Sequence, residues 1–513
     1  MAEIEDRARV AFGNVQDDKT YQKAVKGKEN FLKKFGDDTD AVYHLAAADV
    51  PVIGEALGVR DLVMAQGGAA LDLAADAAAY PAAAETPRTQ ADAAGKPVIV
   101  GNIRMGFGHY RISMAMASAA HAMGYTPYWL DLASFSETTG SKVIAYQNRL
   151  YSMGSKLSQT VPPFNALVWE PLNSEGFRKL SYNSGDQKNA ELCVPLFRDI
   201  PRDTPYVGTH VWPSQTAVHA GMTHVVNAIP DNWPMALHLA EGSIHTIQTP
   251  SSYLGYHQLR GMAKDQLAPM PEDALFYTGH YVDHELVSNI HADCVRRRAR
   301  LRSGGPVRYL LSVGGAGAQE DLFVAICTHV LPLVRRGQAT LFVNVGDHKN
   351  VWDGLKKKVP GIAEMAHEHI GDFSEVAAFA DAALDGDVEG VHAFCNEDIF
   401  AAVYSSNVLM RCSDVLVTKP SEFSFYPVPK LMIHRIGGHE AWGAIRAAEV
   451  GDGTYEMDDT PEVLHMIDSF QDDRELLCFM CDQIELQDKI GTYDGAYKVI
   501  DLAVHGVDAA QRW

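Results

Sequence analysis

Two stretches of the chain repeat one order of features: a short apolar run, a glycine-rich loop and a segment of helical character. The first covers residues 97–123 and has three glycines between positions 101 and 108. The second begins at residue 307 and has three glycines between positions 314 and 317. Strands that turn sharply into helices are typical of parallel sheets covered on both faces. The repetition therefore predicts two α/β units in one chain.

The spacing of further apolar runs supports this division. In the first unit they cover residues 128–132, 206–209, 224–229 and 244–249, and in the second 339–345, 391–394, 414–418 and 430–434. A chain of 513 residues is too long for one core, so we expect two domains with a cleft between them. The predicted parts are a helical N-terminal extension and linker over residues 1–95, a Rossmann-like domain over 96–280, a linker over 281–305, a second Rossmann-like domain over 306–480 and a helical segment over 481–513.

Composition excludes several classes of function. The formal net charge is −21 and the isoelectric point is about 5.4, which argues against a nucleic-acid partner and against broad electrostatic docking on anionic lipid. The first residues lack a secretory signal, and the apolar stretch over 62–80 carries two aspartates, so no membrane span is expected. Seven scattered cysteines without zinc-type pairs favour a reducing cytoplasm.

The first glycine loop predicts a site at the carboxyl edge of its sheet. Glycines let the backbone approach a ligand, and the unpaired N–H groups of a helix start favour negative charge. His109, after Gly106 and Gly108, could act as a general base or donate to a pyrophosphate. Alternatively, the glycines only form a corner and His109 caps the helix. His210 and Asp231 follow two other predicted strands, so all three positions could line one cleft.

The second unit offers residues suited to a phosphorylated ligand. Lys419 follows a predicted strand and could neutralise phosphate, and Glu422 could accept both hydroxyls of a ribose. Gly437 and Gly438 could present backbone N–H groups. Alternatively, Glu422 is only a charge at a helix start and the two glycines only a turn.

A histidine-rich segment over residues 280–291 invites a metal interpretation, since histidines four positions apart on a helix can bind zinc. Gly279 makes a helix through His280 and His284 unfavourable, and a charged linker is the better interpretation. No metal site is therefore expected.

Seven motifs occur in a characteristic order between residues 97 and 460. They are Gly106-Phe107-Gly108-His109, Thr209-His210, Ile229-Pro230-Asp231, Thr278-Gly279-His280, Ser312-Val313-Gly314-Gly315-Ala316-Gly317, Ser413-Asp414-Val415-Leu416-Val417-Thr418-Lys419-Pro420 and Gly437-Gly438-His439-Glu440. This series resembles the GT-B glycosyltransferases, in particular the branch with the peptidoglycan N-acetylglucosaminyltransferase and the plant monogalactosyldiacylglycerol synthase. The resemblance implies two facing Rossmann-like domains, with the C-terminal segment packed back on the first.

The resemblance also implies roles for individual residues. The second domain would bind a nucleotide-sugar, usually a UDP-sugar, and the first would hold the acceptor near Gly106, Gly108 and His210. The donor-side residues implied are Gly314, Gly315, Ala316 and Gly317 at the diphosphate, the backbone around Phe394 at the base, Ser421 and Glu422 at the ribose, and Lys419, Gly438, His439 and Glu440 near sugar and phosphates.

Three functions remain open at this stage. The leading hypothesis is inverting transfer of a hexose or N-acetylhexosamine without a cofactor or bound metal, with His109 as base, or Asp231 alone or through His109. The acceptor is a lipid, a glycan or a small molecule, and peripheral membrane contact is compatible with it. The second hypothesis is a sugar-nucleotide 2-epimerase. The third is a non-catalytic nucleotide-sugar-binding protein, because Ser421 and Pro427 depart from the family pattern.

Overall fold

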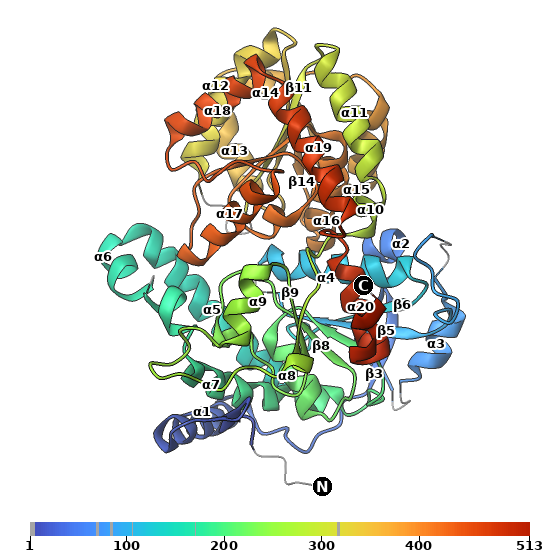
Figure 1. Cartoon of the computed structure of the whole chain (residues 1–513), viewed down its shortest axis with the longest axis vertical. Coiled ribbons are helices and arrows are strands. Elements are labelled where there is room, and N and C mark those ends of the chain that lie inside the picture. Colours follow the sequence, from blue (N-terminus) through green and yellow to red (C-terminus); the bar gives the residue numbers. More distant parts are fainter. Residues whose placement is uncertain are drawn as a thin grey trace.

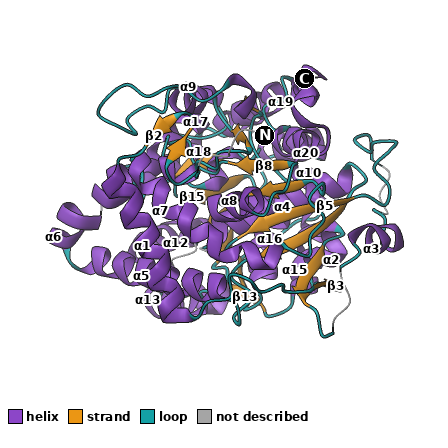
Figure 2. Cartoon of the chain, turned by 90° about the horizontal axis from the view of Figure 1, so that it is seen from below, coloured by secondary structure: helices purple, strands orange, loops and turns teal. Residues whose placement is uncertain are grey.

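The computed structural model describes residues 6–67, 71–82, 86–104, 106–169, 171–314 and 319–512. Figure 1 shows two α/β lobes, one above the other, and Figure 2 shows strands lying between layers of helices. The expected α/β architecture with two facing Rossmann-like domains of the GT-B type is confirmed by two separate, mostly parallel sheets.

The N-terminal domain is built on an eight-stranded sheet of order β10-β9-β8-β7-β5-β6-β4-β3, parallel except for the β3–β4 pair. Its strands are β3 (Leu45–Asp49), β4 (Arg60–Met64), β5 (Pro97–Asn102), β6 (Thr126–Asp131), β7 (Tyr206–Gly208), β8 (Val225–Ala228), β9 (Ile244–Ile247) and β10 (Leu275–Tyr277). Its main helices are α1 (Asp18–Phe35), α2 (Ile53–Leu57), α3 (Leu73–Ala79), α4 (Phe107–Ala122), α5 (Thr139–Thr160), α7 (Leu180–Ala190), α8 (Val211–His219) and α9 (Pro250–His257). The central run Val98, Ile99 and Val100 is fully buried, as expected for a strand with helices on both faces.

Residues 1–95, predicted as a helical N-terminal extension and linker, contain strands as well as the helices α1, α2 and α3. A short ribbon, β1 (Val10–Ala11) and β2 (Asn14–Val15), lies there, and β3 and β4 belong to the domain's own sheet. Strand β4 pairs with β6 through Arg60 and Asp61, which extends the sheet past β6. The Ala-rich composition of β3 suits a helix, but pairing along β4 outweighs this weak local preference.

The C-terminal domain has a six-stranded, all-parallel sheet of order β13-β14-β12-β11-β15-β16. The strands are β11 (Val307–Ser312), β12 (Ala339–Asn344), β13 (Ala366–Ile370), β14 (Val391–Cys395), β15 (Val415–Thr418) and β16 (Lys430–Met432). The helices are α12 (Glu320–Arg335), α13 (Lys349–Lys358), α14 (Ile362–Met365), α15 (Phe373–Asp385), α16 (Ile399–Cys412), α17 (Ala441–Val450), α18 (Thr460–Asp472) and α19 (Glu475–Lys489). The strands expected in this domain are confirmed to within two residues.

The chain crosses between the domains twice. The first crossing leads into α10 (His284–Ser288) and α11 (Ile290–Arg302), and the second leads into α20 (Gly495–His505), which packs against α4 in the lower lobe of Figure 1. The His280 N–H donates to Thr492 O at 2.7 Å, and the Gly495 N–H donates to His280 O at 3.0 Å. A Cβ on Gly495 would lie 2.3 Å from Gly279 O, so this close approach requires glycine.

Helix α4 forms much of the contact between the domains. Arg111 on this helix is 3% exposed, donates to Asn407 Oδ1 at 3.0 Å and lies 3.8 Å from the Phe423 ring centroid. Tyr110 stacks on Phe400 with 5.6 Å between centroids. Since a buried charge is costly without hydrogen bonds, these contacts fix the start of α4 against the C-terminal domain.

All seven cysteines are free and buried. Among the helices in the described part of the chain, none combines the length and the apolar character needed to cross a membrane.

Candidate functional site

Three histidines gather where strands of the N-terminal sheet end. His109 lies in the first turn of α4, His210 follows β7 as the N-cap of α8, and His238 ends the short helix η4 (Ala236–His238). The rings of His109 and His210 meet edge to face with 4.8 Å between centroids. We call His109, His210 and His238 the histidine cluster.

The backbone fixes the protonation of His109. Its Nδ1 lies 2.8 Å from Thr209 O, and because a carbonyl only accepts, Nδ1 carries the hydrogen and Nε2 keeps a lone pair. Burial lowers the pKa of the His109 imidazole, and the hydrogen bond to Thr209 and the negative charges of Glu422 and Asp231 partly oppose this shift. His109 is therefore neutral at pH 7 and presents a proton acceptor.

His210 has the opposite arrangement. Its Nδ1 accepts the Trp212 N–H at 3.2 Å, which leaves the hydrogen on Nε2. Burial, with smaller contributions from His109 and His238, brings the pKa of His210 well below its ordinary value. The two neighbouring rings therefore offer one acceptor and one donor.

Asp231 lies in the loop after β8 and pairs with His238, not with the residue that the sequence suggested. Its Oδ2 is 3.2 Å from His238 Nε2, whereas its influence on His109 is through charge. His238 Nδ1 in turn lies 2.7 Å from the Tyr256 hydroxyl. Sequence reasoning missed His238 and Tyr256, because neither stands directly after a strand.

Glu422 reaches across from the C-terminal domain to the first glycine loop. It begins the short helix η6 (Glu422–Phe425), and a Cβ on Gly108 would lie 1.9 Å from its Oε1. Within the described part of the chain its carboxylate makes no hydrogen bond or ion pair. Gly108 is thus a close-approach glycine, and Gly106, with φ +106°, forms the turn that starts α4.

Lys419 and Glu440 form an ion pair beside the second glycine loop. Lys419 follows β15, and its Cε would lie 3.3 Å from a Cβ on Gly314. Glu440 Oε2 also accepts the N–H groups of Ile436 at 2.9 Å and Gly437 at 3.2 Å. A carboxylate thus occupies a cradle of one ammonium and two backbone donors.

The remaining donor-side predictions are placed as follows. Ser421 caps η6 with Ser424, Gly438 begins the short helix η7 (Gly438–Glu440), and the Phe394 ring is buried against Phe342 and Phe379. Only the backbone of Phe394 is thus available to a ligand. Gly315, Ala316 and Gly317, and the side chain of His439, lie outside the described residues.

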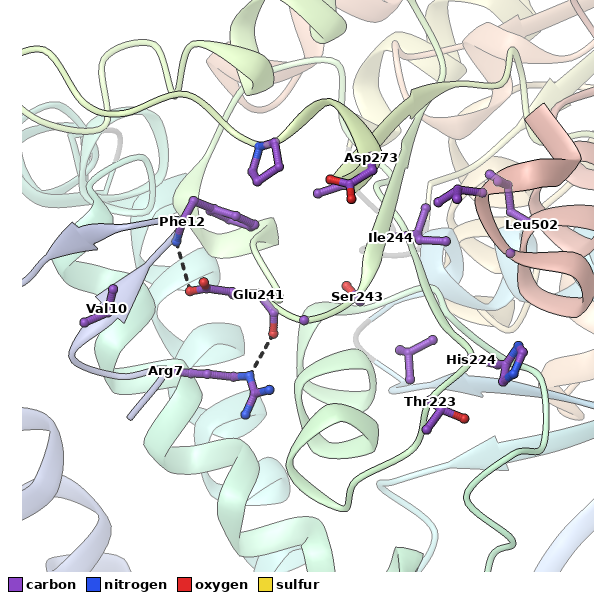
Figure 3. A pocket seen from close by; sticks show the side chains of 16 residues that line it. Arg7, Val10, Phe12, Thr223, His224, Glu241, Ser243, Ile244, Asp273 and Leu502 are labelled. Carbon is purple, nitrogen blue, oxygen red and sulfur yellow. Dashed lines mark hydrogen bonds between the residues drawn. The ribbon is translucent and has the colours of Figure 1, made fainter. Parts of the chain in front are cut away.

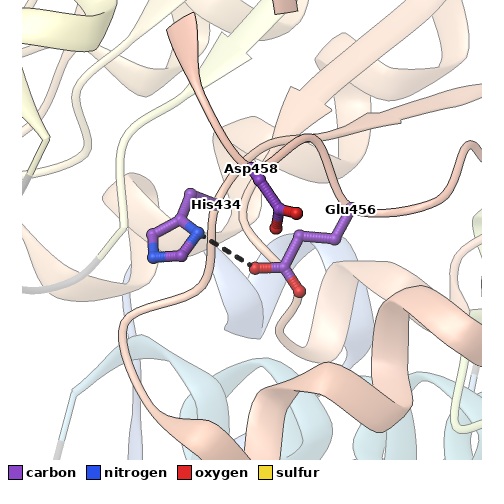
Figure 4. A group of neighbouring side chains, drawn as sticks. All are labelled: His434, Glu456 and Asp458. Carbon is purple, nitrogen blue, oxygen red and sulfur yellow. Dashed lines mark ion pairs between the residues drawn. The ribbon is translucent and has the colours of Figure 1, made fainter. Parts of the chain in front are cut away.

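A possible metal-ligand group lies at the end of β16. Figure 4 shows His434, Glu456 and Asp458, whose ligand atoms lie within 4.8 Å of one another. His434 Nδ1 is 3.3 Å from Glu456 Oε1, and the Arg435 guanidinium also pairs with Glu456. This arginine already balances one of the two carboxylates.

A cavity of about 880 Å³ lies at the opposite, amino edge of the N-terminal sheet. Figure 3 shows Arg7 donating to Glu241 O at 3.1 Å, and the Phe12 N–H donating to Glu241 Oε2 at 2.9 Å. Ile244, at the start of β9, forms part of its wall. The cavity is separate from the histidine cluster, which stands at the carboxyl ends of the strands.

Two family models match the chain in sequence order. Residues 10–258 match "Domain of unknown function (DUF6937)", and residues 270–504 match "Domain of unknown function (DUF6938)". No curated protein matches.

Similar solved structures include a UDP-GlcNAc 2-epimerase from Neisseria meningitidis bound to UDP-GlcNAc, at 11% identity and a TM-score of 0.40, with 81% of this chain and 100% of that chain covered. An α,α-trehalose-phosphate synthase (UDP-forming) from Burkholderia vietnamiensis has the same values. A UDP complex of MnaA from S. aureus has 11% identity and a TM-score of 0.44, with 81% and 97% covered.

Proposed function

We propose that the protein is a nucleotide-sugar-dependent glycosyltransferase, inverting and using a UDP-sugar, that moves a hexose or N-acetylhexosamine to an acceptor hydroxyl. The observation that carries this proposal is the neutral His109, with its Nε2 lone pair, close to the Glu422 carboxylate of the other domain. A base and a candidate ribose ligand thus come together from the two halves of the chain.

In the proposed reaction, His109 Nε2 takes the proton of the acceptor hydroxyl while the acceptor oxygen forms a bond to the anomeric carbon. The bond from that carbon to the diphosphate oxygen breaks, and the nucleoside diphosphate leaves with the electron pair. Attack opposite the leaving group inverts the configuration. Asp231 stabilises the imidazolium by charge, and the His210 Nε2–H is a donor for the acceptor.

The leaving diphosphate gains negative charge, which the second domain is equipped to meet. Lys419 supplies an ammonium, and backbone N–H groups of the loop from Gly314 to Gly317 and of Gly438 supply donors. On binding, the diphosphate takes the cradle that Glu440 occupies. Ser421 and Glu422 hold the ribose, the backbone of Phe394 faces the base, and His439 lies near the sugar. In this scheme the reaction needs no bound metal.

The acceptor is inferred to carry an apolar part. After helix α5 the chain continues through α6 (Pro162–Phe164), η1 (Asn165–Trp169) and η2 (Leu172–Gly176). This segment forms the projection labelled α6 in Figure 1, and η2 contacts η7. It exposes large apolar side chains, and Leu167 is 78% exposed. The others are Leu150, Met153, Leu157, Val168 and Leu172. Such a patch near the cleft suits a lipid or an alkyl chain.

Calorimetric titration with UDP, GDP, ADP and dTDP tests the donor class. We expect selective binding of UDP, followed by release of UDP from a UDP-hexose when an alkyl glycoside in detergent micelles is the acceptor. A sugar-nucleotide epimerised without an acceptor would instead identify a 2-epimerase. Tight binding with no turnover would identify a non-catalytic binding protein, and binding of none by the folded chain would overturn the proposal.

A further inference from the structure

We propose that His238 and Tyr256 are positioning residues that hold the Asp231 carboxylate in place near His109. The catalytic consequence rests on the proposed function, whereas the arrangement itself rests on contacts within the N-terminal domain.

Asp231, His238 and Tyr256 form a continuous chain from the cleft to the core. The Asp231 side chain is 33% exposed, with Oδ2 at 3.2 Å from His238 Nε2. His238 Nδ1 lies 2.7 Å from the Tyr256 hydroxyl, and the Tyr256 side chain is fully buried. Of these three side chains, Asp231 is the one that reaches solvent, so His238 and Tyr256 act on a ligand through Asp231.

The hydrogens in this chain follow from the donor and acceptor rules. An ionised carboxylate only accepts, so His238 Nε2 carries the hydrogen that faces Asp231. His238 Nδ1 lies 2.7 Å from the Tyr256 hydroxyl. Trp233 O, at 3.1 Å, is a second acceptor for the hydrogen of that hydroxyl, and the Met235 N–H approaches the hydroxyl oxygen at 3.4 Å. Tyr256 therefore holds the His238 ring at Nδ1 and is itself held by the loop that carries Asp231.

Neighbouring elements hold these three side chains in place. The Asn227 side chain at β8 donates to His238 O at 2.7 Å and accepts from Ser214 on α8 at 2.8 Å. Helix α9 packs closely against the loop that carries Asp231. A Cβ on Gly255 of this helix would lie 2.1 Å from Pro234 Cγ, so the helix approaches the loop as closely as a glycine allows. These contacts fix the His238 ring and the loop that carries Asp231, and so restrain the carboxylate.

The arrangement affects His109 through charge. The Asp231 carboxylate is among the groups that raise the pKa of His109 against the larger effect of burial. When His109 takes a proton, the nearby negative charge stabilises the imidazolium. An Asp231 side chain free to rotate would do this less well, so turnover would fall while donor binding stayed the same.

The test compares four variants of the full chain by turnover and by UDP titration. His238→Ala and Tyr256→Phe should lower kcat about tenfold or more, with the KM for the donor unchanged. In Tyr256→Phe, which keeps His238, the acid limb of the pH profile should move to lower pH, because the Asp231 charge that raises the pKa of His109 is held less well. His238→Gln, whose amide N–H can still donate to Asp231, should recover part of the loss. Tyr253→Phe, on the same helix, is the matched control and should match wild type.

Two results would overturn the inference. One is a Tyr256→Phe enzyme with wild-type kcat and pH profile. The other is a His238 ring that carries no proton on Nε2 in ¹⁵N-histidine spectra of the wild-type chain. The spectra need no turnover, so they decide the arrangement even if no nucleotide-sugar is bound. Absence of UDP binding by wild type overturns only the proposed function.

Discussion

Replacement of Gly108 by alanine separates the role of this glycine in the helix from its role in the cleft. The added Cβ would lie 1.9 Å from Glu422 Oε1 and 2.5 Å from its Cδ. The carboxylate is the far end of a flexible side chain, so it swings away and the fold survives. Alanine in place of glycine favours a helix by up to about 1 kcal/mol, so the free energy of unfolding should not decrease.

The loss appears in donor binding instead. If Glu422 holds the ribose, displacing it removes hydrogen bonds to a charged group, worth about 1.5–3 kcal/mol, or roughly a 10- to 150-fold weaker Kd for UDP. Calorimetry of Gly108→Ala, Glu422→Ala and the double variant measures this. Since both changes remove one interaction, their effects should not add.

Gly185→Ala is the matched control, because Gly185 lies inside α7 with no atom within 4 Å of the new Cβ. It should leave the Kd for UDP unchanged. If Gly108→Ala binds UDP as wild type does while Glu422→Ala loses tenfold, the position of Glu422 over Gly108 is irrelevant to binding, and the reasoning is refuted.

Three further predictions concern single residues. His109→Ala should lower turnover by about 10²- to 10⁴-fold and leave the affinity for UDP unchanged. Because burial lowers the pKa of His109, wild-type kcat/KM should persist as pH falls through 6.5, the ordinary value for histidine, and should decline only at lower pH. Lys419→Met should weaken UDP binding about tenfold in calorimetry but leave uridine binding unchanged, since only the diphosphate meets the ammonium. Burial raises the pKa of Asp186 to about 8, so the native state retains a proton that the unfolded state releases above about pH 4. The contribution of Asp186 to stability should therefore fall from pH 5 to 8, and it should appear in urea unfolding as a pH-dependent difference in unfolding free energy between wild type and Asp186→Asn.

The sequence predicted those parts of the fold that depend on local pattern. The runs at β5, β11 and β15 are continuous and rich in β-branched residues or leucine, and each ends in glycine or a polar residue. The sequence therefore predicts both the strand and the loop that follows it. Strand β3 was not readable, because Ala46, Ala47 and Ala48 favour a helix and only the partner strand β4 makes them extended.

The candidate site shows the same division. The rule that ligands bind at the carboxyl ends of parallel strands located His109, His210 and Asp231 from the sequence. It could not assign partners: Asp231 pairs with His238, and Glu422 lies over Gly108, which is more than three hundred positions away in the sequence. Such pairings depend on how loops and domains pack, which no local pattern encodes.

The charge of the chain limits how a nucleotide diphosphate could be held. A net charge of −21 gives a field that repels an anion, so binding must come from local groups that oppose this field. At the second glycine loop these are Lys419 and the N–H groups of Ile436 and Gly437, and all of them already serve Glu440. An incoming diphosphate must displace one carboxylate but brings more than one negative charge to the same donors. The exchange is favourable only if the displaced Glu440 carboxylate regains water.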